Sequence, residues 1–439
     1  MAVSRGRMSQ YRIMKSNKDL SNHLLDTAMY TEDALISFLE LYESVMIKPV
    51  FGLGKTYVVP ENGKFRIHSG NEQSELLDKE ELHPYISEKV IKHKKNIIQP
   101  SPLHSNLFQY PLAYFITVHR CSPVSEWVYT SKTEKYKSFL DKYRYLLFFN
   151  KMKRLSIQAA IVLGDYFSDC HTIVIDILID LKGKIWIQET SLHFPKSKWC
   201  QYQTFSSNPK IAPLVPKTDL LTEVTFSDYL NKYKNIIIKP CVGQQGKGIA
   251  KITMADSSAY EIHAGRKKII KTNINEAYDY IKDMYLAKKA YLVQEALSLA
   301  ELDDCPADVR VITQKEDSMW KSTGKIVKVA SKNFFVTNVA QRLLTLEETL
   351  QNLPNLNINI NDFEYEIDKK CVMASELLEE NHPNIKMVGF DIGISSQGDI
   401  WIIEGNYKPD LSMFSRLRNK EMYRTIRKVM KGQRKKRND

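Results

Sequence analysis

The sequence predicts an α+β fold in which one type of domain occurs twice in tandem, each copy built around a mostly antiparallel sheet. The chain of 439 residues is too long for one hydrophobic core, because single cores stop growing at roughly 250 to 300 residues. A set of similar segments recurs in the same order in both halves of the chain. Within each half, short β-branched runs bounded by Gly, Asn and Asp alternate with stretches of helical period.

The repeat is the most informative feature of the chain as a whole. Residues 7–17 resemble 198–208, residues 46–49 resemble 237–240, residues 65–70 resemble 260–265, and residues 176–189 resemble 391–404. The last pair is spaced further apart, which we assign to an insertion near residues 351–368. Chance does not preserve such an order. We therefore expect a degenerate copy over residues 1–197, an intact-looking copy over 198–419 and a basic C-terminal tail over 420–439.

The elements expected inside the second copy follow from local patterns. Residues 236–239, 291–294 and 399–403 are apolar, largely β-branched runs and predict strands. Apolar side chains at helical spacing predict helices over 276–287 and 372–378. Beyond Met413 the apolar residues fit a further helix that docks one face, with the basic tail after it.

Composition and charge narrow the class of protein. Hydrophobic residues make up 43% and charged residues 26% of the chain, as in folded soluble proteins. No run of about 18 apolar residues is present, so we expect a cytoplasmic protein without a membrane span. The net charge of +12 is concentrated in the tail, which is either a solvated segment or an electrostatic docking site for nucleic acid, an anionic surface or an acidic partner. Nucleic acid is disfavoured, because no basic patch is interleaved with aromatic residues.

The most specific chemical signal is a pair of carboxylates near the end of the second copy. Asp391 lies in a predicted strand, residues 395–399 form a turn, and Glu404 lies in the returning strand. In such a hairpin the two carboxylates can face each other, and Asn406 shares the face of Glu404 by the two-residue period. Three hard oxygen ligands suit Mg²⁺, which also keeps positions for water and phosphate. Acidic residues at the surface of a hairpin are the alternative interpretation.

A second, weaker signal is a lysine before a glycine-rich loop. Lys239 ends a predicted strand and precedes Gly243, Gly246 and Gly248. One cation and several backbone N–H groups could there bind an anion such as triphosphate. The loop matches neither the G-x-x-x-x-G-K-[ST] phosphate loop nor G-x-G-x-x-G, and an ordinary hairpin turn remains an alternative.

A third pattern, common by itself, is the strand at 291–297 followed by Glu301, which could offer backbone groups to an adenine and a carboxylate to a ribose. In this order the three signals resemble the ATP-grasp superfamily. Similarity to the narrower YheC/YheD group, ATP-grasp proteins associated with the endospore coat, is carried by Gly6-Arg-Met-Ser-Gln-Tyr-Arg, Lys239-Pro, Asp308-Val-Arg-Val-Ile-Thr-Gln-Lys, Gly389-Phe-Asp-Ile-Gly-Ile and Trp401-Ile-Ile-Glu-Gly-Asn. The resemblance covers the whole second copy and implies the ATP-grasp fold there.

The resemblance also implies roles for individual residues, with ATP and Mg²⁺ as cofactors. Arg310 would face the transferring phosphoryl group, where a fixed guanidinium stabilises developing charge, and Lys239 would be the second catalytic residue. The metal would be held by Asp391, Glu404 and Asn406. ATP would be held by Lys198, Lys239, Gly243, Gln244, Gly246, Gly248, Gln294, Glu295, Leu297 and Glu301.

The sequence departs from the family pattern in two places. Residues 337–343 lack the glycine pair that relatives often carry before the metal residues, which leaves the roles of Asn338 and Arg342 open. The first copy keeps Lys48, Asp176 and Glu189 but has lost most other ligands. Alignment puts Ser191, Tyr114, Asn106 and Pro100 where the second copy has Asn406, Arg310, Glu301 and Glu295. We therefore expect the first copy to be a scaffold or substrate platform without catalytic activity.

Two functions from different classes follow. The first is an ATP- and Mg²⁺-dependent ligase that phosphorylates a substrate carboxylate and lets an amine or similar nucleophile attack the acylphosphate, with both substrates unidentified. The alternative is a non-catalytic, spore coat-associated structural protein whose nucleotide site is vestigial or regulatory. In that case the basic tail would bind spore coat proteins, and the protein would be found with the endospore coat.

Overall fold

The computed structural model describes residues 3–52, 54–69, 75–91, 94–101, 112–135, 142–243, 246–255, 259–287, 289–337, 340–352 and 359–435. The chain divides into two compact units. Unit 1 comprises Met1–Phe194, Leu220–Ser227 and Asn275–Tyr291, and unit 2 comprises Pro195–Asp219, Asp228–Ile274 and Leu292–Asp439. The first boundary lies close to the predicted division after residue 197, and two short segments of the predicted second copy belong to unit 1.

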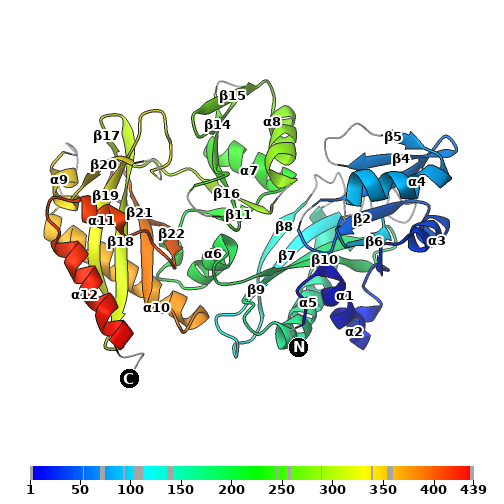
Figure 1. Cartoon of the computed structure of the whole chain (residues 1–439), viewed down its shortest axis with the longest axis horizontal. Coiled ribbons are helices and arrows are strands. Elements are labelled where there is room, and N and C mark those ends of the chain that lie inside the picture. Colours follow the sequence, from blue (N-terminus) through cyan, green and yellow to red (C-terminus); the bar gives the residue numbers. More distant parts are fainter. Residues whose placement is uncertain are drawn as a thin grey trace. The chain divides into compact units, whose positions relative to one another are not determined.

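The first half of the chain builds two antiparallel sheets (Figure 1). One has the order β1-β6-β2-β3-β4-β5 and consists of β1 (Ala28–Met29), β2 (Val45–Pro49), β3 (Thr56–Glu61), β4 (Lys64–Ser69), β5 (Glu75–Leu77) and β6 (Asn96–Pro100). Its core is shared with α3 (Glu32–Tyr42), α4 (Lys79–Tyr85) and the π-helix Ile86–Ile91. The other has the order β10-β9-β7-β8 and consists of β7 (Leu112–His119), β8 (Val128–Glu134), β9 (Thr172–Ile179) and β10 (Ile185–His193). Its core is shared with α1 (Arg7–Lys15), α2 (Lys18–Ser21) and α5 (Lys142–Tyr166).

The second half builds two further sheets. One has the order β11-β16-β12-β13-β14-β15 and consists of β11 (Thr218–Leu220), β12 (Asn235–Pro240), β13 (Ala250–Met254), β14 (Tyr260–Ala264), β15 (Lys267–Lys271) and β16 (Tyr291–Glu295). The other has the order β20-β19-β18-β21-β22, with β17 (Glu301–Leu302) beside β18 (Cys305–Glu316), and includes β19 (Met319–Ala330), β20 (Ala340–Leu344), β21 (Met387–Ile394) and β22 (Ile400–Asn406). The helices are α6 (Lys198–Ser206), α7 (Glu223–Tyr233), α8 (Ile274–Ile281), α9 (Leu346–Gln351), α10 (Ile360–Asn381), α11 (Ser412–Arg416) and α12 (Glu421–Lys435), with a 3₁₀ turn Ala212–Leu214 and a π turn Lys282–Leu286.

The two halves share their strand order and also their irregularities. In each six-stranded sheet the last of the strands in sequence lies between the first and the second. The register of β7 with β8 shifts after Thr117, and that of β18 with β19 shifts after Ile312. The β9–β10 and β21–β22 hairpins each carry a bulge beside their aspartate, at Gln188 and Ile403. These shared features support the tandem duplication inferred from the sequence, because bulges at matching positions do not follow from strand order alone.

Local sequence explains where several elements begin and turn. Helix α9 begins at a capping box, in which Thr345 Oγ1 accepts from the N–H of Glu348 at 3.1 Å and the carboxylate of Glu348 accepts from the N–H of Thr345 at 2.7 Å. Helix α10 follows Asn359, whose side chain accepts from two N–H groups of the first turn. The predicted turn between β21 and β22 contains Gly398 at a φ of 89°, a conformation that favours glycine.

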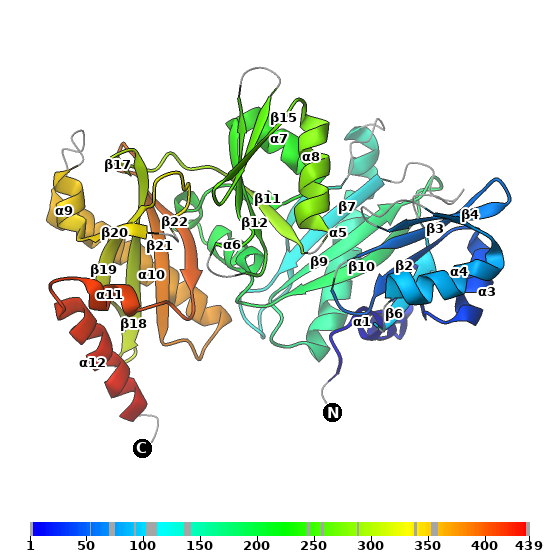
Figure 2. The same ribbon diagram turned by 45° about the horizontal axis from the view of Figure 1, so that its top comes forward.

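The sheet containing β18 has a core on one face and a cleft on the other. Because alternate residues of a strand point to opposite faces, Val309 belongs to the core shared with α10, whereas Asp308 and Arg310 line the cleft. Helices α11 and α12 cover Ile312 and Ile326 on the cleft face. Figures 1 and 2 show α10 (orange) and α12 (red) on opposite sides of this sheet. The cleft face is thus divided between a helix-covered end and an open end.

The docked helix predicted beyond Met413 is present as α12, which spans Glu421–Lys435 within the basic C-terminal segment and buries Ile426 fully. One expectation about the second copy, the position of the insertion, is revised. Residues 360–368 belong to α10 and are not an insertion. The additional elements are β20 and α9, which have no counterpart among the described residues between β8 and α5. No helix in the described ranges combines the length and the apolar character that crossing a membrane requires.

Candidate functional site

Unit 2 contains a cleft of about 1570 Å³, in which most of the predicted site residues gather. The predicted residues that line it are Lys198, Lys239, Gly243, Gly246, Gln294, Glu295, Leu297, Glu301, Arg310, Asp391, Glu404 and Asn406. Gly248 is not among the lining residues, and Gln244 lies outside the described residues. Among the residues that the structure describes, ten lysines and arginines and seven aspartates and glutamates line the cleft. This excess of positive charge favours an anionic ligand.

The acidic wall of the cleft is the β21–β22 hairpin. From the turn, the two strands pair in regular register until Ile403, which is an extra residue on β22. After this bulge Asp391 lies opposite Glu404, and directly opposed residues point to the same face. Asn406 donates from Nδ2 to Asp391 Oδ2 at 3.3 Å. The bulge therefore brings the two carboxylates and the amide together.

Asp391 is enclosed by cations of the same sheet. Arg310 donates from Nε and Nη2 to the two oxygens of Asp391 at 2.9 and 3.0 Å. Lys328 Nζ lies 2.8 Å from Asp391 Oδ1 and 2.9 Å from Asp308 Oδ1. All four side chains belong to residues that are buried. Burial favours the neutral acid, but Lys328 and Arg310 outweigh it and lower the pKa of Asp391 to about 2. At Asp308 burial prevails, and its pKa is raised.

The basic wall of the cleft comes from β12, β16 and the start of α6. Lys239 is buried at the end of β12, and its Nζ donates to Gln294 Oε1 on β16 at 3.0 Å. Burial lowers the pKa of Lys239 to about 8, although the nearby Glu404 opposes the shift. Lys198 binds Glu404 Oε2 at 2.9 Å and the carbonyl oxygen of Gly243 at 3.3 Å. Lys198 therefore connects the glycine loop with the acidic hairpin.

The remaining predicted ligands lie along the loop after β12 and the segment after β16. Gly246 and Gly248 have φ angles of 67° and 80°, in the left-handed region that favours glycine. The carboxylate of Glu295 accepts from a backbone N–H of the segment before β11 at 2.7 Å, so this side chain already has a role within the fold. Leu297 is half-buried and Glu301 is exposed, and both line the cleft.

The residues at the acidic wall fit a hard divalent cation. Two carboxylates and an amide on paired strands are oxygen donors of the kind that Mg²⁺ prefers. In the part of the chain that the structure describes, no three His, Cys, Asp or Glu side chains are grouped so that they could hold a metal ion. Asn406 would therefore be needed as the third ligand beside Asp391 and Glu404. Cations of this chain already contact both carboxylates, and a bound metal would have to displace them.

Sequence reasoning missed two residues of this site. One is Lys328, described above. The other is Gln201 of α6, whose Nε2 donates to the carbonyl oxygen of Gly405 at 2.8 Å and whose Oε1 accepts from its N–H at 3.2 Å. Gln201 thereby fixes the residue between Glu404 and Asn406. The repeat carried a signal for it, because Gln10 occupies the matching place in the first copy.

Residues 337–343 depart from the family pattern and left the roles of Asn338 and Arg342 undecided. The structure describes Arg342. Arg342 on β20 forms an ion pair with Asp303 at 2.6 Å, and both side chains are substantially exposed. Arg342 is not among the cleft-lining residues. Asn338 lies outside the described residues.

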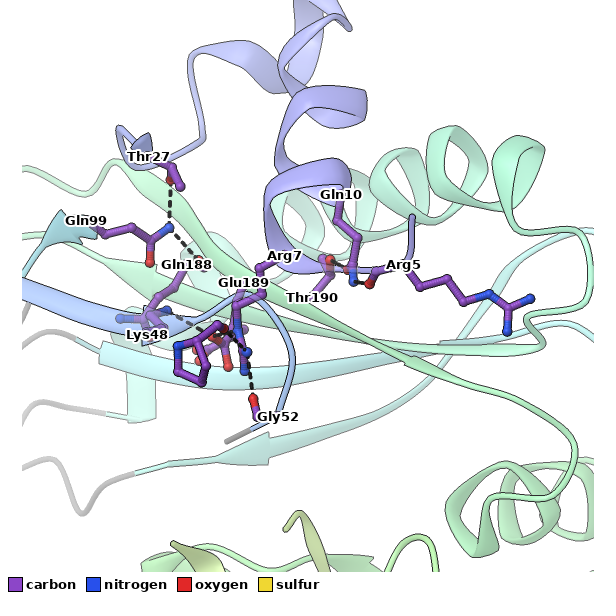
Figure 3. Close-up of polar contacts among 12 residues, drawn as sticks. Arg5, Arg7, Gln10, Thr27, Lys48, Gly52, Gln99, Gln188, Glu189 and Thr190 are labelled. Carbon is purple, nitrogen blue, oxygen red and sulfur yellow. Dashed lines mark hydrogen bonds and ion pairs between the residues drawn. The ribbon is translucent and has the colours of Figure 1, made fainter. Parts of the chain in front are cut away.

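In unit 1 the counterpart residues form a closed cluster. Glu189 accepts from Lys48 Nζ at 2.9 Å and from Arg7 Nε at 3.2 Å, and Figure 3 shows these side chains gathered together. Lys135 Nζ lies 2.8 Å from each oxygen of Asp176. Burial lowers the pKa of Lys48 to about 8. Burial opposes ionisation of Glu189 as well, yet Lys48 and other nearby cations hold its pKa well below the usual range.

The space beside this cluster is small. A cavity of about 20 Å³ is lined by Arg7, Gln10, Gln99, Glu189 and neighbouring residues. That volume accommodates about one water molecule. The acidic pair of unit 1 is thus neutralised from within the fold.

The strand register corrects one assignment in the first copy. Asp176 lies opposite Phe115 on β7, as Asp391 lies opposite Arg310 on β18. Phe115 therefore stands in the place of Arg310, whereas Tyr114 belongs to the core on the other face. The alignment was shifted by one residue here, and a shift of one moves a side chain to the opposite face of a strand.

The same register relates two lysines that the sequence comparison did not pair. Thr133 lies opposite Phe115, and Ile326 lies opposite Arg310. Two residues further along the chain are Lys135, directly after the end of β8, and Lys328 on β19. Both copies therefore keep a lysine on the aspartate, although only the second keeps the arginine.

Comparisons with known proteins place the second half of the chain. The YheC/D-like ATP-grasp family model matches residues 192–431. The chain is 28% identical over 246 residues to the endospore coat-associated protein YheD of Bacillus subtilis (strain 168), covering 54% of this chain and 52% of that protein. It is 24% identical over 218 residues to the endospore coat-associated protein YheC of the same organism, covering 48% and 59%. The chain thus spans about half the length of the curated relatives that it matches.

Among solved structures, the ATP-grasp ligase PsnB complexed with a minimal precursor matches with 18% identity and a TM-score of 0.31, over 50% of this chain and 55% of that one. This likeness is too weak to carry an argument. The family model, in contrast, covers more than half of the chain and includes both walls of the cleft. The chain therefore belongs to the YheC/D-like ATP-grasp family and has the ATP-grasp fold.

Proposed function

We propose that the cleft of unit 2 binds ATP with Mg²⁺ and that the protein is a ligase that joins a carboxylate to an amine or a similar nucleophile. One observation carries this proposal. Lys198 and Lys239 on one wall approach the carboxylates of Asp391 and Glu404 on the other, within a cleft of net positive charge. Fixed cations facing a carboxylate pair form an arrangement suited to phosphates bridged by a divalent cation.

In this proposal each wall has its own task. Lys239 and Lys198 bind phosphate oxygens, and the backbone N–H groups around Gly246 close over them. The adenine lies against the segment after β16, where Gln294, Glu295 and Leu297 contribute mainly through backbone and apolar contacts, and Glu301 binds the ribose. Gln294 also holds the ammonium of Lys239 in place.

The chemistry would proceed in two steps. A carboxylate oxygen of the acceptor attacks the γ-phosphorus, ADP leaves, and an acylphosphate is formed. The nucleophile then attacks the acyl carbon, inorganic phosphate leaves as the new bond forms, and the proton lost by the nucleophile passes to the departing phosphate or to solvent. Arg310 stabilises the charge of the transferring phosphoryl group. The metal, held by Asp391, Glu404 and Asn406, would supply neutralisation of phosphate charge.

The test uses the full chain and two matched variants. Glu404→Gln removes a proposed metal ligand, whereas Glu366→Gln changes an exposed carboxylate of α10 that pairs with Lys370. Removal of a residue that only supports a metal ligand weakens metal binding about 10- to 100-fold. Because Glu404 is a proposed ligand itself, we expect Glu404→Gln to weaken Mg²⁺-dependent binding of an ATP analogue by more than this. Glu366→Gln should bind as the wild type does.

Turnover provides a separate test of the ligase activity. ADP release that requires both a carboxylate and an amine supports the ligase. Binding without turnover in any substrate mixture counts against it.

For unit 1 we infer a non-catalytic role as a scaffold or substrate platform. The supporting observations are the ion pairs that occupy Asp176 and Glu189 and the replacement of Arg310 by Phe115. Nucleotide titration should therefore reach a stoichiometry of one per chain. A stoichiometry of two would contradict this inference.

A second candidate function, a structural role at the spore coat, is favoured by α12. Its apolar side is docked, and its exposed side carries Arg424, Arg427, Lys428 and Lys431 at the spacing of one helical stripe. The relatives YheD and YheC are named as endospore coat-associated. We propose that this stripe binds acidic spore coat proteins, so that the protein is made in the cytoplasm and associates with the coat.

The stripe allows the two functions to be separated. Changing its four cations to glutamate should abolish coat association and leave nucleotide binding intact. Glu404→Gln should leave coat association unchanged. Loss of coat association in Glu404→Gln would show that the nucleotide site is needed there as well.

A further inference from the structure

We propose that Lys328 and Arg310 act as a lock on Asp391, so that the metal can bind only when nucleotide phosphates have drawn these two cations away. This inference rests on the proposed function, because it takes the cleft to be the nucleotide site. It adds an order of events and a role for Lys328, a residue that the site assignments did not include.

The lock consists of four buried side chains of balanced charge. Asp308 and Asp391 provide two negative charges, and Arg310 and Lys328 provide two positive ones. Asp391 Oδ1 accepts from Lys328 at 2.8 Å and from Arg310 Nε at 2.9 Å, and its Oδ2 accepts from Arg310 Nη2 at 3.0 Å. Both oxygens of the proposed metal ligand are therefore occupied by donors that carry a positive charge.

A divalent cation arriving alone meets two obstacles at this cluster. It must take oxygens that already bind cations, and it would leave a buried group of four with two uncompensated positive charges. Neither cost is recovered from water, because these side chains are almost completely removed from it. The apo site is thus closed to free metal by the residues of the chain itself.

When a triphosphate is present, Arg310 and Lys328 have an alternative to Asp391 as their binding partner. The phosphate oxygens offer Arg310 and Lys328 acceptors of higher charge than the carboxylate that they leave. Lys239 and Lys198 on the other wall hold the same phosphates in the proposed site. Asp391 is then released to the metal, and Arg310 and Lys328 have phosphate oxygens as their new partners.

Unit 1 contains a corresponding arrangement, in which a lysine already occupies both oxygens of the aspartate. Lys135 contacts both oxygens of Asp176 at 2.8 Å, and register places it where unit 2 has Lys328. Phe115 replaces the arginine there. A lysine at this place is therefore sufficient to satisfy the aspartate without a metal, in a copy that has lost most of its nucleotide ligands.

The experiment measures Mn²⁺ binding to the full chain by electron paramagnetic resonance, with and without a non-hydrolysable ATP analogue. We expect the wild type to bind Mn²⁺ at least about tenfold more tightly when the analogue is present, and, by reciprocity, the analogue to bind more tightly by the same factor when Mn²⁺ is present. Equal Mn²⁺ affinity in both conditions, with the analogue bound, overturns the lock and leaves the proposed function standing.

Variants test the lock without any nucleotide. Lys328→Met should bind Mn²⁺ more tightly than the wild type in the absence of the analogue. The double variant Lys328→Met with Asp308→Asn removes one charge of each sign, keeps the cluster balanced, and should show the same gain if the single variant fails to fold. Lys325→Met is the matched control, because Lys325 lies on the same strand but pairs with Asp368 of α10.

The outcomes separate the two proposals. A gain in Mn²⁺ affinity in the Lys328 variants, and not in Lys325→Met, supports the lock. No gain in either Lys328 variant overturns it. If the analogue fails to bind with or without metal, the proposed function falls, and the variants still decide whether Lys328 excludes the metal.

Discussion

Unit 1 should lose stability sharply between pH 7 and pH 5, because two of its histidines are buried in the neutral state. His119 is fully buried, with Nδ1 2.8 Å from Thr172 Oγ1, and His193 is also buried. Burial lowers the pKa of each to about 4, with the nearby His171 adding to the effect at His119. The unfolded chain binds these protons near pH 6.5, so protonation favours unfolding as the pH falls.

The size of the stability loss follows from the difference between the histidine pKa in the unfolded chain and in the folded protein. Each histidine contributes its full stabilisation above pH 6.5, and this contribution is lost as the pH falls towards 4. Between pH 7 and pH 5 the loss amounts to roughly 2 kcal/mol per histidine, and roughly 4 kcal/mol for both if they titrate independently. A loss of that size is a large fraction of the stability of a typical domain.

Hydrogen exchange measured by mass spectrometry can localise the effect. Peptides from β7 and β9 should lose protection at pH 5 after correction for intrinsic exchange rates, whereas β18 and β21 of unit 2 should lose much less. The double variant His119→Gln with His193→Gln should remove most of this pH dependence, even if its stability at pH 7 is lower. His68→Gln, at an exposed position of β4, is the control. A pH dependence in the double variant equal to that of the wild type would refute the reasoning.

Three substitutions test other contacts. Lys48→Met leaves the half-buried carboxylate of Glu189 with Arg7 as its remaining partner and should cost about 1 to 3 kcal/mol in urea unfolding, while Lys48→Met with Glu189→Leu should cost less. Gln201→Leu leaves two groups of Gly405 unpaired and should lower the free energy of unfolding of unit 2 by about 2 to 3 kcal/mol. Gly389→Ala adds a Cβ that would lie 2.4 Å from a proline ring atom and should cost about 1 to 3 kcal/mol, visible as a lower Tm.

Sequence patterns predicted which strands carry the acidic pair, but not how the strands are aligned. The apolar runs around Asp391 and Glu404 and the turn between them indicated a hairpin. Regular pairing from that turn would have set Ile403 opposite Asp391. The bulge at Ile403, which instead sets Glu404 opposite Asp391, depends on backbone hydrogen bonding. No residue type in the hairpin predicts it.

The two residues that sequence reasoning missed act over long separations. Lys328 lies on β19 and reaches Asp391 on β21 across the intervening strand β18. Gln201 reaches the hairpin from a helix near the start of the second copy. Contacts of this kind depend on the strand order of the finished sheet. The one-residue misassignment at Tyr114 has a similar origin, because only the register of β7 with β9 shows which side chain faces Asp176.

Periodicity was the more reliable guide near the end of the chain. The apolar residues after Met413 predicted a docked helix, and α12 packs that stripe onto the sheet. Charge alone suggested a trailing tail over the same residues. The helical pattern prevailed because Ile426 and its neighbours have an apolar face to cover.

That cover has a consequence for synthesis of the protein. Ile312 and Ile326 lie on β18 and β19, and their cover comes from α11 and from residues 421–435 of α12. At ribosomal speeds, roughly 5 to 20 s pass between the emergence of β19 and that of α12. During this interval an apolar surface stays open beside the unfinished cleft, which makes the nascent chain a client for chaperones that shield exposed strands.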